Sequence, residues 1–183
     1  MLMKHLPGYG YTMMLSGKDQ GKEKYLYLYR KDKWTLRREY IFDVDITRPP
    51  YVVTFERKGR QLRGGKIVIL DSITLIGYHT KPSNAYNETI RLLEQVYPKV
   101  LNDSGKNPVI ILDDLNASFT TRWVPGFINK LSELRLICGI GDKQDTTVIP
   151  SGVKNRFKSY DRIIYQESNS HKIKDCKVYK FND

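Results

Sequence analysis

Two oxygen-bearing side chains follow directly on a short apolar strand in the second half of the chain. The run PVIILDDLNASF, residues 108–119, places Asp114 and Asn116 at the end of that strand. Because side chains alternate along a strand, Asp114 and Asn116 point to one side, whereas Asp113 and Leu115 point to the other. Carboxylate and amide oxygens bind hard cations, and an amide N–H can donate to a phosphoryl oxygen. The pattern is typical of a metal or phosphate site, and also of a turn or a helix N-cap.

Two further segments each place a polar residue at the end of an apolar strand. IGYHTKPSNAYNETI, residues 76–90, ends a strand at His79 before a turn and a helix. KSYDRIIYQ, residues 158–166, places Asp161 at the start of another strand, whose isoleucines are typical of a core. The sequence thus offers three strand ends that suit the same chemistry.

Taken in order, these segments resemble the deoxyribonuclease I-like branch of the endonuclease/exonuclease/phosphatase superfamily. The segments that carry the resemblance are KEKYLYLYR at 22–30, RPPYVVTF at 48–55, YHTKPSNA at 78–85, LDDLNA at 112–117, DTT at 145–147 and YDRI at 160–163. The resemblance implies one α/β (α+β) domain over residues 1–183. Its fold would be a two-sheet sandwich flanked by helices, with the site at one edge of the sandwich.

The resemblance also implies a role for each matching residue. His79 would be a general base or acid, and Glu23 would be the carboxylate that hydrogen-bonds to it and fixes its tautomer. Asp161 would orient a second histidine. Asp114 and Asn116 would hold Mg²⁺, or Mn²⁺ or Ca²⁺ in its place, or the scissile phosphate. Together these roles imply metal-assisted hydrolysis of a phosphodiester.

Some parts of the family pattern have no counterpart in this sequence. The family's two opening strands, which carry an asparagine and a metal-binding glutamate, are not matched, and neither is its closing serine-aspartate-histidine strand. His171 lacks the aspartate and the apolar run that would mark the second histidine, and Asp113 replaces a small residue. We therefore expect weakened metal binding and turnover. The chain would be a fragment, a rebuilt fold, or a protein whose sheets are completed by another chain, including a second copy.

The net charge of +11, from 31 Lys and Arg against 20 Asp and Glu, predicts a polyanionic partner. The positive charge is concentrated at 30–38 and at 56–66, where three glycines indicate the tip of a hairpin. Such a hairpin could contact phosphates along double-stranded DNA, or it could be a solvated loop. The resemblance adds a backbone-contacting arginine from the segment at 48–55. The candidate nucleic-acid contacts are Arg48, Arg57, Lys58, Arg60 and Arg63.

Hydrophobic patterning predicts mostly strands and few helices. The predicted strands are 25–29, 51–56, 66–70, 73–78, 109–112 and 162–165. One helix is predicted over 84–97, with Pro98 ending or kinking it, and another over 125–134.

Three functions are compatible with these observations. The first is a divalent-metal-dependent endonuclease acting on DNA, the second a nucleic-acid-binding protein without turnover, and the third a phosphatase of the same fold. The breadth of the basic segments favours nucleic acid. No apolar run reaches the roughly 18 residues of a membrane helix, and we identify no export signal. The sequence therefore predicts a soluble protein. Secreted members of the family that it resembles usually carry a disulfide near the metal strand, and no cysteine lies near Ser118 or Lys158, so the resemblance favours a reducing, cytoplasmic location.

Overall fold

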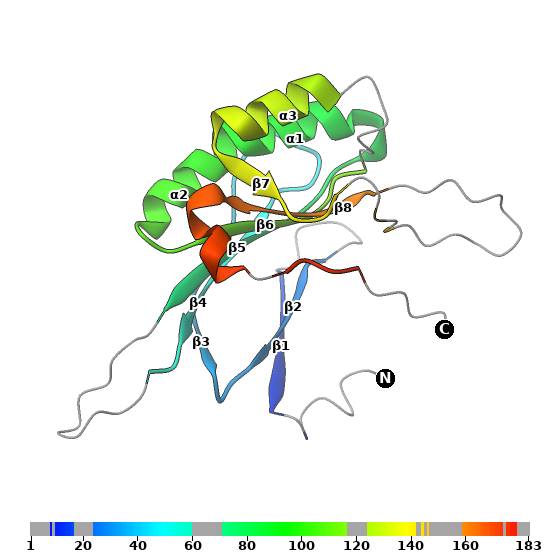
Figure 1. Ribbon diagram of the computed structural model, residues 1–183. Helices are drawn as coiled ribbons and strands as arrows, with labels where there is room; N and C mark the ends of the chain where they lie inside the picture. Colours follow the sequence, from blue (N-terminus) through cyan, green and yellow to red (C-terminus); the bar gives the residue numbers. More distant parts are fainter. Residues whose placement is uncertain are drawn as a thin grey trace, which may run out of the picture.

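Two β-sheets and a layer of helices make up the part of the chain that the structure, a computed structural model, describes (Figure 1). The described residues are 8, 10–16, 24–59, 71–116, 124–141, 144, 146, 159–173 and 175–178. The strands are β1 (Tyr11–Leu15), β2 (Leu26–Arg30), β3 (Trp34–Ile41), β4 (Tyr51–Arg57), β5 (Ser72–His79), β6 (Val109–Asp114), β7 (Leu136–Cys138) and β8 (Asp161–Gln166). The helical segments are η3 (Pro82–Asn84), α1 (Ala85–Arg91), η4 (Leu92–Val96), α2 (Tyr97–Ser104), α3 (Val124–Glu133) and η5 (Glu167–Lys172).

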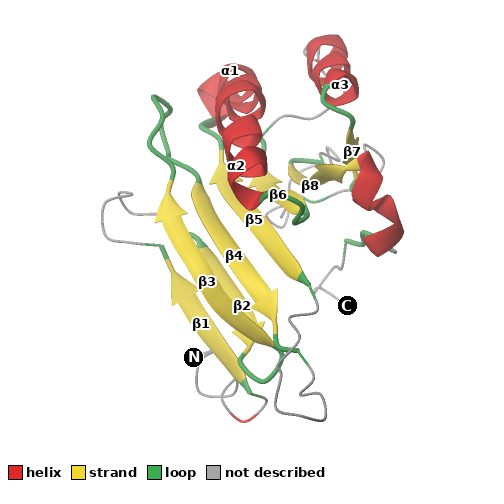
Figure 2. Ribbon diagram, turned by 90° about the vertical axis from the view of Figure 1, so that its left-hand side faces the viewer, coloured by secondary structure: helices red, strands yellow, loops and turns green. Residues whose placement is uncertain are grey.

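The larger sheet has six strands in the order β3-β4-β5-β6-β8-β7, and β1 and β2 form a separate two-stranded sheet. Only β5 and β6 pair in parallel, joined by the crossover through α1 and α2, and the other pairs are antiparallel. The helices cover one face of the large sheet, and β1 and β2 lie on the other side (Figures 1 and 2). This arrangement confirms the predicted α/β sandwich flanked by helices.

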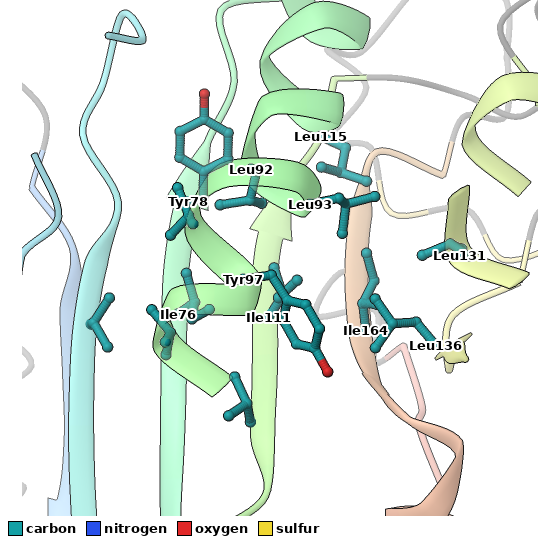
Figure 3. Packing of buried hydrophobic residues seen from close by; sticks show 14 of the residues in the cluster. Ile76, Tyr78, Leu92, Leu93, Tyr97, Ile111, Leu115, Leu131, Leu136 and Ile164 are labelled. Atoms are coloured by element: carbon teal, nitrogen blue, oxygen red, sulfur yellow. The ribbon is translucent and has the colours of Figure 1, made fainter. Parts of the chain in front are cut away.

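The main core lies between the large sheet and the helices. Side chains at alternate positions of β4, β5, β6 and β8 point toward α1, η4, α2 and α3, as expected for strands with a period of two. Figure 3 shows this packing, with Leu92 and Leu93 between the helix and the strands that carry Ile76 and Ile111. The four are fully buried, and a side chain of this size gains about 1.5–3 kcal/mol on burial.

A second, aromatic core joins the two sheets. The rings of Tyr27 and Tyr29 on β2 lie against Phe55 of β4, with centroid distances of 6.4 and 4.8 Å. Gly77 on β5 permits this close approach, because a Cβ atom there would lie 2.6 Å from the Tyr27 hydroxyl. The aromatic alternation of 25–29 therefore packs the small sheet onto the large one.

The helix predicted over 84–97 is longer than the sequence indicated. It runs from α1 through η4 to the end of α2 at Ser104, so Pro98 does not end it. Proline cannot donate to the carbonyl four residues earlier and clashes with it, and a π-helical segment, η4, lies immediately before the proline. The wider turn accommodates Pro98 without breaking the helix. The second predicted helix is confirmed as α3.

Several predicted features fall outside the described residues. These are the strand at 66–70, the glycines Gly64 and Gly65 of the hairpin tip, and Glu23. β4 and β5 are nevertheless antiparallel neighbours, with Glu56 opposite Ser72, so the segment between them connects the two strands of a hairpin. Within the described ranges, no helix is both long and apolar enough to cross a membrane.

Candidate active site

Three of the predicted site residues lie in one row across three adjacent strands. His79 at the end of β5 is opposite Asp114 at the end of β6, and Asp114 is opposite Asp161 at the start of β8. Their side chains share a face because they occupy equivalent positions in register. The His79 Nε2 atom lies 3.6 Å from Asp114 Oδ2, and the two side chains are 33% and 38% exposed. The row is therefore open to solvent and to a ligand.

The two carboxylates of the row repel each other. Burial and the negative charge of Asp114 raise the pKa of Asp161 above its ordinary value, against the lowering influence of a hydrogen bond with Thr146 and of the His79 charge. Two carboxylates on adjacent strands create a negative potential. A bound cation or a positive charge on the neighbouring histidine would offset it. Electrostatics thus couples all three residues of the row.

Asn116 stands beside the row in a backbone conformation that few residues adopt. Its φ is 47°, in the left-handed region that asparagine tolerates better than most residues. Its backbone N–H donates to Asp114 Oδ1 at 3.0 Å, and its Nδ2 donates to the Thr80 carbonyl at 3.0 Å. The turn after β6 therefore fixes the Asp114 carboxylate and places the Asn116 side chain against the end of β5.

Arg48 reaches the same strand ends from the loop before β4. Its Nη1 donates to the Thr80 carbonyl at 3.0 Å and to the His79 carbonyl at 3.4 Å. The backbone N–H of His79 in turn donates to the hydroxyl of Tyr25 at 3.1 Å. These contacts hold the last residue of β5 from two sides, and they place the Arg48 guanidinium at the edge of the row.

A buried carboxylate, Glu88 of α1, ties this region together from the helix side. It is 1% exposed and accepts hydrogen bonds from the Tyr78 hydroxyl at 3.0 Å, from the Lys81 N–H at 2.8 Å, and from both the N–H and the hydroxyl of Thr47. Burial alone would raise its pKa, but these donors lower the pKa below its ordinary value. Glu88 therefore links the Arg48 loop to the turn that follows His79.

The alternate residues of the same strands form a second row on the helix-facing side. Tyr78 is opposite Asp113, and Asp113 is opposite Arg162. Asp113 is 6% exposed, and burial together with the charges of Asp114 and Asp161 raises its pKa well above the ordinary value. Asp113 thus points away from Asp114, as the alternation predicted, and does not supply a further ligand at the open row.

The remaining predicted site residues do not join the row. Arg57 is the last residue of β4 and Lys58 follows it, at the end of the sheet opposite His79. The start of β4, where Tyr51 pairs with Gly77, is the end that lies beside His79. Glu23, Arg60 and Arg63 lie outside the described residues. His171 lies in η5, after the far end of β8 from Asp161, so its position gives no support to it as a second histidine.

Sequence reasoning missed three contributors to this region: Tyr25, Thr80 and Glu88. Tyr25 belongs to the alternating aromatic run, but its hydrogen bond to His79 joins residues 54 positions apart. Glu88 was indistinguishable from an exposed helix residue, because a single acidic residue at the start of a helix is usually solvated. Only the pairing of β5 with the helix layer brings its donors together.

A divalent cation would find a small set of oxygens here. Asp114 ends β6 and Asn116 follows it in the turn, with its backbone N–H on Asp114 Oδ1, and the charge of Asp161 adds to the negative potential at Asp114. Within the described ranges, no group of three or more His, Cys, Asp or Glu side chains is arranged to hold a metal ion. Mg²⁺ binds through one or two carboxylates and keeps several waters or substrate phosphates, so Asp114 and Asn116 are the residues that would hold it.

Known proteins with similar sequences are deoxyribonucleases. The chain is 30% identical over 171 residues to deoxyribonuclease-1 of Gallus gallus, covering 85% of this chain and 55% of that protein. It is 28% identical over 169 residues to deoxyribonuclease gamma of Homo sapiens, covering 86% and 51%. The chain is homologous to the deoxyribonuclease I-like proteins. It spans about half the length of the curated relatives it matches, and no protein-family model matches it.

Solved structures of this superfamily share the fold. An endonuclease/exonuclease/phosphatase family protein from Bacteroides thetaiotaomicron superposes with a TM-score of 0.59 at 16% identity, covering 91% of this chain and 64% of that one. The endonuclease domain of TRAS1, a telomere-specific non-LTR retrotransposon, superposes with a TM-score of 0.56 at 19% identity, covering 88% and 69%. Sequence and structure thus agree on the deoxyribonuclease I-like fold.

Proposed function

We propose that this chain carries the phosphodiester-hydrolysing site of a divalent-metal-dependent endodeoxyribonuclease. The observation that carries the proposal is the row formed by His79, Asp114 and Asp161, three residues predicted separately from sequence and aligned by strand register on one open face. Homology to deoxyribonucleases supports DNA as the substrate. The net charge of +11 supports a polyanionic substrate of some kind.

Each residue of the row has a distinct proposed task. His79 exchanges a proton with the attacking water or the leaving oxygen, and the Asp114 carboxylate, 3.6 Å from its Nε2 atom, orients the imidazole. Asp161, with its raised pKa, holds a second proton-transferring group or the water itself. Arg48, at the edge of the row, binds a flanking phosphate. A divalent cation bound by Asp114 and Asn116 would stabilise charge on the phosphoryl oxygens.

Plasmid nicking by the purified protein, with and without Mg²⁺ or Mn²⁺, tests this proposal. Removal of His79 or Asp114 should slow nicking by about 10²–10⁴-fold, the usual contribution of one proton-transferring group. His171→Ala and Asp103→Asn are matched controls, because they change the same residue types away from the row and should leave nicking within about twofold. EDTA should abolish nicking.

A second candidate, a DNA-binding protein without turnover, is favoured by the sparse set of metal ligands among the described residues. It predicts no nicking by wild type, together with DNA retention in a gel shift. That retention should weaken steeply as salt rises, because neutralised phosphates release counterions. Nicking that is unaffected by His79→Ala and Asp114→Ala would come from a contaminant and would refute the hydrolytic proposal. Failure of both nicking and retention would refute a nucleic-acid function altogether.

A further inference from the structure

A cavity of about 340 Å³ lies between the two sheets, at the end remote from the row. It is situated by the turn where the chain leaves β2 and enters β3, which form the two arms of a V in Figure 1. The separation along β5 from Ile73, which lines the cavity, to His79 is about 20 Å at ~3.3 Å per residue. The cavity is therefore a feature separate from the candidate active site.

Aromatic rings dominate its walls. Tyr27 and Tyr29 come from β2, Trp34 from β3 and Phe55 from β4, and Ile73 and Leu75 of β5 form the apolar floor. Tyr29 and Phe55 approach to 4.8 Å between centroids at an interplanar angle of 49°, so one pair of rings already presents tilted faces to each other. Such walls favour a flat aromatic ligand that stacks on the rings over a flexible aliphatic chain.

Positive charge surrounds the mouth. Lys33 lines the cavity, is exposed, and makes no ion pair with another described residue. Arg30 also lines it, but its guanidinium is paired with Asp32 at 2.6 Å, and Asp32 also feels the charge of Lys33. Among the cations that line the cavity, Lys33 is the one without an ion pair to a described residue. Arg57 and Lys58 are close by, because Trp34 pairs with Arg57 and the Lys58 N–H donates to the Lys33 carbonyl. A bound aromatic ligand would therefore carry negative charge.

From these features we infer that the cavity binds a nucleobase that carries phosphate, with the base among the rings and the phosphate at Lys33. A volume of this size lies in the range of small-molecule sites. The base could come from a free nucleotide or from an unpaired base of single-stranded DNA. If the base belongs to single-stranded DNA, the cavity adds a contact to that strand far from the hydrolytic row. This alternative rests on the proposed function.

Fluorescence of Trp34 provides a direct test with adenosine 5′-monophosphate as the probe. The chain has two tryptophans, so the Trp123→Phe background leaves Trp34 as the sole reporter. Saturable quenching by the nucleotide is expected, and ribose 5-phosphate, which lacks the base, should bind about 5- to 150-fold more weakly. Non-saturating quenching, or equal binding of both compounds, would overturn the inference.

Two substitutions locate the ligand. Lys33→Ala should weaken nucleotide binding about three- to tenfold, whereas Lys31→Ala, an identical charge change in the same turn but outside the cavity wall, should change it about twofold or less. Ile73→Phe fills the cavity from its floor and should abolish quenching. Equal effects of Lys33→Ala and Lys31→Ala would indicate only a diffuse attraction of anions and would overturn the assignment of the phosphate to Lys33.

The two sources of the base are separated by comparing a short oligodeoxyadenylate with its blunt duplex. If the source is single-stranded DNA, Ile73→Phe should weaken binding of the oligonucleotide and leave the duplex unchanged, and if it is a free nucleotide, only the monophosphate should respond. Failure of this inference differs from failure of the proposed function. Wild-type protein that nicks plasmid but does not bind the nucleotide refutes only the cavity, and protein that binds the nucleotide but does not nick refutes only the hydrolytic site.

Discussion

Replacement of Glu88 by alanine should destabilise the protein strongly although Glu88 lies outside the open row. The substitution leaves the hydroxyl of Tyr78 without its acceptor, because Tyr78 is 2% exposed and donates to Glu88. An unpaired buried donor costs about 1–3 kcal/mol. The loss of charge-assisted hydrogen bonds from Lys81 and Thr47, which water replaces in part, adds about 1 kcal/mol each. The expected cost to the free energy of unfolding is therefore about 3–5 kcal/mol.

Urea unfolding followed by circular dichroism measures this cost at neutral pH. Glu133→Gln is the matched control, since Glu133 lies on a helix, is 64% exposed and pairs with Lys130, and its removal should cost about 0.5 kcal/mol or less. A cost below about 1 kcal/mol for Glu88→Ala would refute the argument that Glu88 binds the loop, the strand and the turn together.

The pH dependence of stability provides a second check on Glu88. Its pKa in the folded protein is below its ordinary value of about 4.3, so the folded state binds fewer protons than the unfolded state. The stabilisation by Glu88 is therefore fully present above that value and is lost as the pH falls through the lower folded pKa. The stability difference between wild type and Glu88→Gln should shrink over this acidic window, and a constant difference would contradict the assigned charge state.

Three further outcomes are expected from other residues. Asp113 should show the opposite pH dependence, since burial raises its pKa: its contribution to the free energy of unfolding should fall as pH rises from about 4, so the stability of wild type relative to Asp113→Asn should decrease over that range in urea unfolding. Gly77→Ala should cost about 1–3 kcal/mol, because the new Cβ meets the Tyr27 hydroxyl at 2.6 Å, and Tyr27→Phe in the same protein should recover most of that cost; equal stability of the single and double variants would contradict the clash. Carboxyl NMR titration should give Asp161 a pKa above the usual value of about 3.9, and Asp114→Asn should lower it by removing a repulsive charge; an unchanged titration would contradict their coupling.

Four of the six strands of the large sheet were predictable because their apolar runs are bounded by turn residues, whereas β3 and β7 were not predicted. β4, β5, β6 and β8 all appear where the pattern placed them. The period-two rule also assigned Asp114 and Asp113 to opposite faces, and the burial of Asp113 agrees. Strand phase depends only on neighbouring residues, so the sequence alone was sufficient to predict which face each of these side chains occupies.

Contacts that join distant segments were not predictable in this way. The hydrogen bonds from Arg48 to the carbonyls of Thr80 and His79 depend on where the loop before β4 passes the end of β5. The resemblance singled out Arg48, but as a backbone-contacting arginine and not as a support for the strand end. Likewise, the continuation of the helix past Pro98 depends on a π-helical segment that propensity does not reveal. The cavity arises from the angle between two sheets, which no single segment encodes.

The two faces of β5, β6 and β8 have different roles: one face carries the candidate active-site residues, and the other packs against the helices. On one face, His79, Asp114 and Asp161 are open to solvent, and one residue earlier or later along each strand the side chains are buried against the helices. A slip of one residue in any pairing would exchange the two sets, burying the open row and exposing the core. The hydrogen bonds that Glu88 accepts from the Tyr78 hydroxyl and the Lys81 N–H oppose such a slip at the end of β5. Substitutions in the open row should therefore impair activity with little loss of stability, whereas substitutions at Glu88 should reduce both, because the register that aligns the row depends on it.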